Sequence, residues 1–424
     1  MRTIIIGAGA AGLAAGRALQ DAGQDVLILE ARDRIGGRVW TDRTFANIPI
    51  ENGAEWVHGH TAASWKYVTE AGLSAIRVNK FRGYLFEHLG RLKPYEELRA
   101  VPGFERIINL EEHEIGEIDP AAPDKSVKAW IDSLGLPQEW IPLAYMLVAH
   151  PYFAEPDEIG VADLSREVRA HHAGYDNFRL RDGYDQMFAH MARGLDVRLG
   201  APVTRVRWGK RGAAVLAGGD EITADKVIIT VPLSLLQQNV IAFNPILPAW
   251  KTNAIHALRM GWGMKAQLKF SSPFWDVACG RVISTAAAPV WWSPTFGRPE
   301  AEAVMIGFIG GDRAKRLYAM PEAQAIEVML DDLCRLFQTD APRKTIQTGR
   351  IIRWADDEWA RGGYSFVPTG AYDSRAELAR AVDGVLHFAG EATVTASNPA
   401  TVHGAIESGW RAAAEIAAEM VGIS

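Results

Sequence analysis

The first 39 residues, MRTIIIGAGAAGLAAGRALQDAGQDVLILEARDRIGGRV at 1–39, decide the fold of this chain. An apolar run at 3–6 predicts a buried parallel strand, and the Ala- and Leu-rich segment after it predicts a helix. The pattern Gly-x-Gly-x-x-Gly joins them, formed by Gly7, Gly9 and Gly12. In this pattern the first glycine permits a tight turn, the second lets a phosphate approach bare backbone, and the third lets the helix pack on the strand.

A second strand is expected at 26–29, and it ends in Glu30. A carboxylate there is placed to accept hydrogen bonds from a ribose diol. Spaced glycines alone also mark ordinary strand–helix–strand units, but here the strand, glycines, helix, second strand and acid follow one another in the order of a dinucleotide fingerprint. The sequence therefore predicts a pyrophosphate on the N–H groups at the start of the helix. The contacts expected here come from Ala10, Ala11, Glu30 and Ala31.

A second glycine pair, Gly36-Gly37, follows among arginines. It offers another stretch of bare backbone to a diphosphate. Arg32, Arg34 and Arg38 surround the pair, and their guanidinium groups are able to neutralise the diphosphate charge.

The composition is that of a globular, enzyme-like chain. Its 424 residues, 48% of them hydrophobic, suggest about two or three domains with a sizeable core. The net charge of −6 without a basic stripe argues against nucleic acid as a partner. No apolar stretch reaches ~18 residues, so we expect no membrane-spanning helix. A strand that starts at residue 3 leaves no room for a secretory signal peptide.

The two cysteines, Cys279 and Cys334, form neither a CxxC pair nor a metal-ligand spacing. We interpret them as structural thiols and expect no metal site. Their number favours a reducing cytoplasm as the location.

The segment at 32–38, Arg-Asp-Arg-Ile-Gly-Gly-Arg, resembles the second phosphate motif of the flavin-containing amine oxidase superfamily. The resemblance implies FAD as the cofactor, contacted by Gly36, Gly37 and Arg38, with Arg32 beside them. It covers essentially the whole chain, and its motifs are specific at both ends.

The stretch Gly-Ala-Glu-Trp-Val-His-Gly at 53–59 resembles the family segment beside the flavin ring, most closely in animal polyamine and spermine oxidases. This likeness implies cofactor contacts from Gly53, Ala54, Glu55 and Trp56. It also places His58 near the amine site. From the residues alone, His58 is a candidate base or hydrogen-bond donor, and a satisfied structural histidine is the alternative.

Lys265 lies in an expected strand, Gly-Met-Lys-Ala-Gln-Leu-Lys-Phe at 263–270. Alternation puts Lys265, Gln267 and Lys269 on one face, which on its own indicates a half-exposed strand with lysines in water. By resemblance, however, Gly-Met-Lys matches the position of the amine oxidases' active-site lysine, which holds a water beside flavin N5. We assign that role to Lys265.

The C-terminal part carries further motifs of the family. By resemblance, Trp354 packs near the flavin ring and Tyr364 forms one aromatic wall, while Gly363 stands where covalent monoamine oxidases carry a cysteine. FAD is therefore expected to bind without a covalent link. Ala-Gly-Glu at 389–391 matches a nucleotide-facing motif, and Thr401 begins the last helix where monoamine oxidases have a second tyrosine. The contacts implied elsewhere are Val203, Thr230, Pro232, Gly390, Glu391, Thr401, Val402 and Ala405.

Two features of the middle segment have an ordinary interpretation. The acidic run Glu111, Glu112, Glu114, Glu117 and Asp119 is expected to be a solvated helix face, with a focusing field for cationic substrates as the alternative. Trp291 and Trp292 are expected to fill a core, although they could line a substrate channel.

The fold class that we predict is α/β, with a glutathione-reductase-type FAD-binding domain and an inserted mixed α+β substrate-binding domain. The FAD-binding domain is expected to comprise 1–79, 179–242 and 340–424, and the substrate-binding domain 80–178 and 243–339. The site is expected in the crevice outside the strand carboxyl ends.

The resemblance implies an FAD-dependent amine oxidase that acts on a primary or secondary amine or polyamine. Hydride passes to the flavin, water hydrolyses the imine, and O2 becomes H2O2. The expected catalytic residues are Lys265, His58, Tyr364 and Thr401, and the expected partners are a small amine and O2, without nucleic acid or membrane, in a monomer or homodimer. Two alternatives stay open: an L-amino-acid oxidase, which needs an arginine for the substrate carboxylate, and a non-catalytic binding protein on the same fold.

Overall fold

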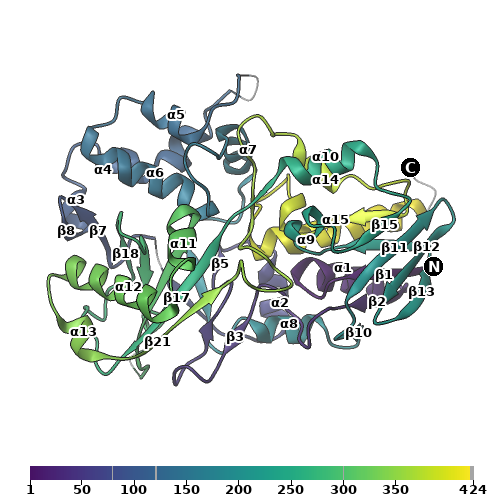
Figure 1. The fold of residues 1–424 in the computed structure, drawn as a ribbon, viewed down its shortest axis with the longest axis horizontal. Coiled ribbons are helices and arrows are strands. Elements are labelled where there is room, and N and C mark those ends of the chain that lie inside the picture. Colours follow the sequence, from purple (N-terminus) through teal and green to yellow (C-terminus); the bar gives the residue numbers. More distant parts are fainter. Residues whose placement is uncertain (79, 120–121, 299, 421–424) are drawn as a thin grey trace.

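The computed structural model describes residues 1–78, 80–119, 122–298 and 300–420. Its first layer is a five-stranded parallel sheet in the order β10-β2-β1-β14-β23 (Figure 1). These strands are β1 (Arg2–Ile6), β2 (Asp25–Leu29), β10 (Asp196–Arg198), β14 (Lys226–Ile229) and β23 (Leu386–Phe388). β1 is central, and Ile4 and Ile5 are fully buried on its two faces, as is usual in parallel sheets covered on both sides. The predicted α/β class is confirmed.

Two helices from opposite ends of the sequence cover one face of this sheet. α1 (Ala10–Asp21) and α15 (Val402–Met420) lie side by side, and both contribute to one apolar core. A Cβ added at Gly409 of α15 would stand 2.3 Å from the carbonyl oxygen of Ala11. The glycine therefore allows the close crossing that fixes the start of α1.

The other face of the parallel sheet packs against a four-stranded sheet in the order β13-β12-β11-β15. Its strands are β11 (Val203–Gly209), β12 (Gly212–Ala217), β13 (Asp220–Ala224) and β15 (Ala242–Asn244). The next strand along the chain, β14, joins the parallel sheet, because its apolar run is buried on both faces.

A second large sheet has seven strands in the order β21-β17-β20-β19-β18-β7-β8. The strands are β7 (Tyr84–His88), β8 (Arg91–Pro94), β17 (Gly263–Phe270), β18 (Arg281–Ile283), β19 (Val290–Trp292), β20 (Ala303–Gly310) and β21 (Ile346–Arg353). β21 lies in the range expected for the FAD-binding domain, but it pairs with β17 of this sheet. The expected boundary at residue 79 falls outside the described residues.

β17 is buried on both faces. On one side Met264, Ala266 and Leu268 pack against α12 (Glu322–Phe337), an amphipathic helix. On the other side lie Lys265 and Gln267, which face the segment around β4 (Ile50–Glu51). Gln267 is 0% and Lys265 5% exposed, so the interpretation of this face as solvated is wrong.

A block of helices closes over the second sheet, at the upper left in Figure 1. Its members are α3 (Tyr95–Leu98), α4 (Phe104–Ile108), α5 (Val127–Asp132), α6 (Ile141–Ala149) and α7 (Val161–Ala170). Leucine, isoleucine and aromatic side chains from these helices pack with Phe86 of β7.

The remaining elements connect the layers. The strands are β3 (Thr41–Asp42), β5 (Val57–His58), β6 (Ala75–Val78), β9 (Asn177–Leu180), β16 (Arg259–Met260) and β22 (Ser365–Phe366). The helices are α2 (Ser64–Glu70), α8 (Asp185–Met191), α9 (Leu233–Gln237), α10 (Ala249–Ala257), α11 (Gly311–Tyr318), α13 (Ala341–Thr345) and α14 (Ser374–Ala379).

Candidate active site

A cavity of about 600 Å³ runs from the carboxyl ends of the parallel strands to the second sheet. It lies where ligands bind in open α/β sheets. The residues from the sequence predictions that line it are Gly7, Gly9, Ala10, Ala11, Glu30, Ala31, Arg32, Gly36, Gly37, Arg38, Gly53, Ala54, Glu55, Trp56, His58, Val203, Thr230, Pro232, Lys265, Trp354, Tyr364, Gly390, Glu391, Thr401, Val402 and Ala405. Gly12 is the predicted residue that stands behind this lining.

The glycines at the start of α1 form a cradle of bare backbone. A Cβ at Gly12 would stand 1.9 Å from the carbonyl oxygen of Gly7, so Gly12 serves helix–strand packing. At Gly9 an added Cβ would meet no atom within 4 Å, so this backbone opens into the cavity. Gly37, at φ +57°, approaches Gly9, and the two glycine motifs share one cradle. This arrangement suits a diphosphate.

Glu30 stands beside the cradle, held by backbone groups. Its Oε2 accepts from the Ala8 N–H at 2.7 Å, and its Oε1 accepts from the Arg32 N–H at 2.9 Å. The Arg32 guanidinium pairs with Asp357, 2.9 Å from Nη1 to Oδ2. The fixed Glu30 carboxylate keeps lone pairs for a ribose diol. Arg34 points elsewhere, over the ring of Trp40.

Arg38 and Glu391 join the two ends of the chain. The Arg38 guanidinium lies 3.0 Å from Glu391 Oε1 and donates to the Gly363 carbonyl at 2.5 Å. Glu391 also accepts from the Ser365 hydroxyl at 2.7 Å. Burial acts to raise the pKa of the Glu391 carboxyl, but the charges of Arg38 and Arg375 outweigh burial and hold the pKa below its usual value. Glu391 therefore stays ionised on the cavity wall.

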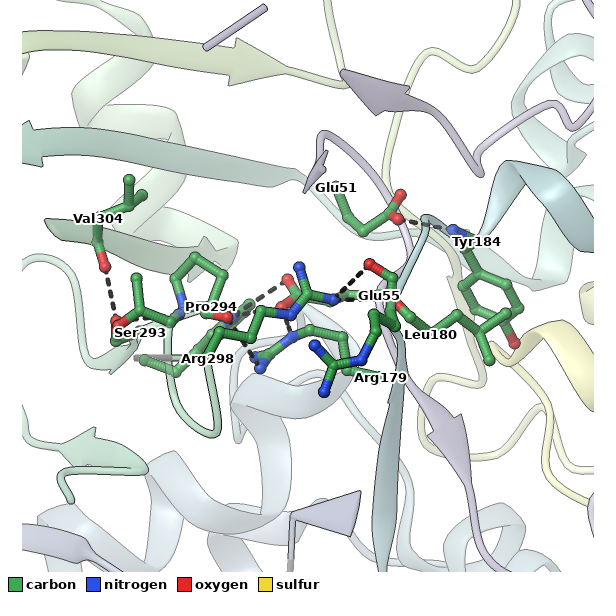
Figure 2. Close-up of polar contacts among 12 residues, drawn as sticks. Glu51, Glu55, Arg179, Leu180, Tyr184, Ser293, Pro294, Arg298 and Val304 are labelled. Carbon is green, nitrogen blue, oxygen red and sulfur yellow. Dashed lines mark hydrogen bonds and ion pairs between the residues drawn. The ribbon is translucent and has the colours of Figure 1, made fainter. Parts of the chain in front are cut away.

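Lys265 and Glu55 form a buried ion pair on the cavity wall. Lys265 Nζ lies 3.1 Å from Glu55 Oε2 and donates to the Glu51 carbonyl at 3.0 Å. Arg179 pairs with the other oxygen of Glu55 at 2.8 Å (Figure 2). The indole N–H of Trp292 donates to the same carboxylate at 3.0 Å. Burial acts to raise the pKa of Glu55, but the two cations and their hydrogen bonds lower the pKa further than burial raises it.

Glu51, next to this pair, has a different electrostatic environment. Its carboxylate accepts from the Tyr184 N–H at 2.8 Å (Figure 2) and from the Thr41 hydroxyl at 2.8 Å. Burial raises the pKa of Glu51 to about 7 despite these donors. Two neighbouring carboxyls therefore differ in charge at neutral pH, because only Glu55 has cations paired to it.

His58 lies on the cavity wall and donates from Nδ1 to Asn177 Oδ1 at 2.6 Å. That bond fixes the tautomer and leaves Nε2 as an acceptor. Burial lowers the pKa of His58 to about 4, so the ring is neutral at neutral pH. Its ring centroid is 6.3 Å from that of His403, near the start of α15.

Thr401 is the N-cap of α15. Its hydroxyl donates to the Asn398 carbonyl at 2.7 Å and accepts from the Gly404 N–H at 3.0 Å. Thr401 and Val402 both line the cavity, so the positive end of the helix dipole faces it.

The aromatic wall is larger than the sequence indicated. Tyr364 stacks on Phe153, with centroids 4.5 Å apart, and Phe153 lies 4.6 Å from Phe308. Phe308 in turn lies 5.9 Å from Trp292. Trp291 fills the core, as expected, whereas its neighbour Trp292 lines the cavity, which was the alternative. These rings come from four separate segments.

Four glycines make room for the Phe153 ring. A Cβ at Gly261, Gly263, Gly310 or Gly363 would stand 2.0–2.6 Å from atoms of Phe153. Phe153 itself has φ 55°, a backbone conformation that bulky residues rarely adopt. A side chain at Gly363 would therefore displace the aromatic wall.

Sequence reasoning missed the wall on the helical-block side of the cavity. Glu111, Glu112 and Glu167 line it there, so the interpretation of a solvated face is wrong for the first two. Glu167 accepts from the Tyr152 hydroxyl and from Asn398 Nδ2, both at 3.0 Å. Burial raises the pKa of Glu167 to about 8, and burial also raises that of Glu111. Glu112 pairs with Lys80. Glu167 is thus mostly protonated at neutral pH, and the charge of Glu112 is compensated by Lys80.

The other missed residues have no motif that marks them in the sequence. Besides those already described, the cavity lining includes Met146, Leu147, His150, His171, Tyr175, Arg281 and Ile283. In the described parts of the chain, no group of three or more His, Cys, Asp or Glu side chains could hold a metal ion. None of the described helices is long and apolar enough to cross a membrane.

The sequence profile described as "Flavin containing amine oxidoreductase" matches residues 10–417, nearly the whole chain. The chain belongs to this family. Among its relatives, human lysine-specific histone demethylase 2 is 32% identical over 98% of this chain, which spans only 53% of that protein. Rice polyamine oxidase 3 is 30% identical over 97% of this chain and 88% of its own length. The chain thus spans about half the length of the histone demethylases it matches.

Solved structures of two amine oxidases share the fold of this chain. Putrescine oxidase bound to putrescine superposes with a TM-score of 0.87 at 24% identity, with 99% of both chains covered. Cyclohexylamine oxidase from Brevibacterium oxydans superposes with a TM-score of 0.84 at 26% identity and equal coverage.

Proposed function

We propose that this protein is an FAD-dependent amine oxidase that converts a primary or secondary amine to an imine, which water hydrolyses, with O2 reduced to H2O2. The observation that carries the proposal is the buried Lys265–Glu55 pair, which lies on the wall of the same cavity as the glycine cradle. A charged lysine desolvated beside a flavin site has a chemical use there.

The residues present suit FAD. Gly9 and Gly37 leave backbone open to a diphosphate, Glu30 offers carboxylate oxygens to a ribose, and the N-terminus of α15 offers positive dipole beside Thr401. FAD, when bound, supplies the redox chemistry by accepting a hydride and passing electrons to O2. We propose non-covalent binding, because the position of Gly363 has no thiol and no room for one.

The aromatic wall orients the substrate. Tyr364, Phe153, Phe308 and Trp292 form an apolar surface for the carbon chain. The neutral His58 ring offers Nε2 as an acceptor for the N–H of an amine. Because the ammonium of Lys265, which lies over Trp292, repels a second ammonium, the bound amine is held without its proton, the form that can lose a hydride.

Lys265 provides a fixed positive charge for the reaction with O2. Dioxygen first accepts one electron and becomes an anion, so a nearby ammonium stabilises the charge as it develops. Glu55 holds the Lys265 side chain in place, and Arg179 shares that carboxylate. We propose Lys265 as a water-holding and O2-promoting group.

The same site bears on the substrate class and on the alternative of a non-catalytic binding protein. The names of the plant relatives suggest polyamines as one substrate class. A non-catalytic scaffold is not favoured, because the glycine cradle and Lys265 are both present.

The division into FAD-binding and substrate-binding domains stays a proposal, as does a monomer or homodimer. We also propose the cytoplasm as the location, because the two cysteines are unpaired.

The test uses the purified protein and a panel of monoamines, diamines, polyamines and L-amino acids. The proposal expects a yellow protein whose visible flavin absorbance bleaches under anaerobic conditions with at least one amine. Admission of O2 should then restore the absorbance and release H2O2. A colourless protein, or a yellow one that no amine bleaches, would contradict it.

A further inference from the structure

Arg281 lies on the cavity wall, and no acidic side chain among the described residues pairs with it. The residue begins β18 and is partly buried. Its guanidinium carbon lies 5.3–5.9 Å from the ring centroids of Trp56, Tyr84 and Trp292. Within the described parts of the chain, the guanidinium makes no hydrogen bond or ion pair to a protein group. Its five N–H donors are therefore available to a ligand.

Two nearby arginines, Arg179 and Arg298, are bound by other groups of the protein. Arg179 also stacks on Trp56, 4.5 Å from its centroid, and it is paired with Glu55 at 2.8 Å. Arg298 donates to the carbonyls of Leu180 and Arg181, and Figure 2 shows it beside Arg179. Of these three arginines, Arg281 lines the cavity, and its guanidinium has no hydrogen-bond or ion-pair partner among the described residues.

The described acidic residues on the helical-block side of the cavity do not pair with Arg281. Glu167 accepts from the Tyr152 hydroxyl and from Asn398 Nδ2. Glu111 lies 3.4 Å from the same hydroxyl, and Glu112 is paired with Lys80. His58 is neutral at neutral pH, because burial, together with the charge of Arg281, lowers its pKa to about 4. These acidic side chains therefore leave the Arg281 guanidinium to a ligand.

We propose that Arg281 binds the carboxylate of the substrate, so that the preferred substrates are amino carboxylates. The planar guanidinium matches a carboxylate with two parallel N–H···O bonds, and the aromatic rings around it exclude water and strengthen that pair. Lys265 and Arg281 both lie over Trp292, at 5.2 and 5.9 Å from its centroid. A carboxylate bound by Arg281 and an amine near Lys265 would therefore lie against the same indole ring. The inference rests on the proposed amine oxidation and narrows its substrate class.

The first experiment compares matched substrates on the wild-type holoenzyme. Glycine, L-alanine, 3-aminopropanoate, 4-aminobutanoate and 5-aminopentanoate are set against the alkylamines of equal carbon count, with spermidine as a further arm. At least one amino carboxylate should exceed its alkylamine in kcat/KM by about tenfold or more, the gain of a charge-assisted bidentate contact. The series also separates α-amino acids from longer ones. Equal or lower values for every amino carboxylate, or a preference for spermidine, would overturn the proposal.

The second experiment removes the guanidinium. Arg281→Met should lower kcat/KM for the preferred amino carboxylate by about 100-fold and that for the matched alkylamine by less than about threefold. Arg281→Lys should restore part of the loss. The control is Arg380→Met, because Arg380 stacks on Trp250 at 3.6 Å without lining the cavity, and both substrates should keep wild-type values. A loss that is equal for both substrates in Arg281→Met would refute the carboxylate role.

A binding measurement gives a readout independent of turnover. Butanoate should perturb the visible flavin spectrum of the wild type and raise its Tm, butanamide should do neither, and Arg281→Lys should weaken the butanoate response. Absence of any response to butanoate would count against the subsite. If amines bleach the flavin while butanoate and the amino carboxylates show no preference, this inference fails and the amine oxidase proposal stands. If no amine bleaches it, the proposed function fails.

Discussion

The ammonium of Lys265 lies 3.1 Å from the carboxylate of Glu55, and both side chains are almost fully buried on the cavity wall. A buried pair of this kind contributes little net stability, because desolvation offsets the attraction between its charges. Its presence in the same cavity as the glycine cradle therefore calls for a functional explanation. The charge of Lys265 is fixed where the proposed reaction with O2 develops negative charge.

The first prediction concerns Lys265→Met, which keeps the length of the side chain and removes the charge. Removal of one preorganised donor typically slows a reaction by ~10² to 10³, so we expect reoxidation by O2 to slow by at least about tenfold. Anaerobic bleaching by substrate should change less. The matched control is Lys269→Met on the same strand face. Lys269 Nζ lies 3.4 Å from Glu302 Oε1, and Lys269 does not line the cavity. Stopped-flow absorbance measures both half-reactions, and equal wild-type rates in both would refute the role.

The second prediction concerns Gly363→Cys, which introduces a thiol at the position used for covalent flavin attachment in monoamine oxidases. Because a Cβ there would stand 2.4 Å from the Phe153 ring, we expect a lower Tm and no covalent link. Acid precipitation should leave a yellow supernatant for both the wild type and the variant. Gly363→Cys combined with Phe153→Ala removes the clash and should recover part of the lost Tm. Flavin retained in the wild-type pellet would show that the non-covalent assignment is wrong.

The third prediction concerns His58→Ala. His58 is neutral above about pH 5, since burial lowers its pKa to about 4, so it contributes no titration between pH 6 and 9. We expect KM for the amine to rise several-fold while the shape of the kcat/KM pH profile and the FAD content stay unchanged. His60→Ala is the control, because His60 is exposed and pairs with Asp176. Loss of FAD or of folding in His58→Ala would support a structural role instead.

The fourth prediction concerns the pH dependence of stability. Glu167 has a folded pKa of about 8, above the ordinary value of 4.5, so the folded protein binds the extra proton between these values. Its stabilising effect is present at low pH and is lost as the pH rises toward 8. Glu167→Gln should remove this term, and the difference in unfolding free energy between variant and wild type should grow by up to about 1.4 kcal/mol per pH unit between pH 5 and 8. Denaturant titrations at several pH values measure it, and a constant difference would contradict the assignment.

The fold was predictable where the signal is local. The strand, glycines, helix, strand and acid at 2–30 lie within one short stretch, and β1, α1 and β2 follow that pattern. Thr401 was placed correctly at the start of α15 because a capping hydroxyl and a helix pattern are both local features.

The substrate side of the cavity was not predictable in the same way. Alternation along β17 indicated a solvated face, because nothing near Gln267 in the sequence shows that the segment around Asn52 covers it. Phe153, Arg281 and Glu167 come from distant segments that converge only in the folded protein. Each of them also contacts a residue more than 100 positions away in the sequence, and so its environment is absent from any one stretch of sequence.

The most direct test of the account is the anaerobic visible spectrum of the purified protein before and after addition of amines from the panel, amino carboxylates included. We predict a flavin band that bleaches on mixing with substrate and returns on admission of O2. A protein without a flavin band, or a band that every amine leaves unchanged, would contradict the assignment of this cavity as an amine oxidase site.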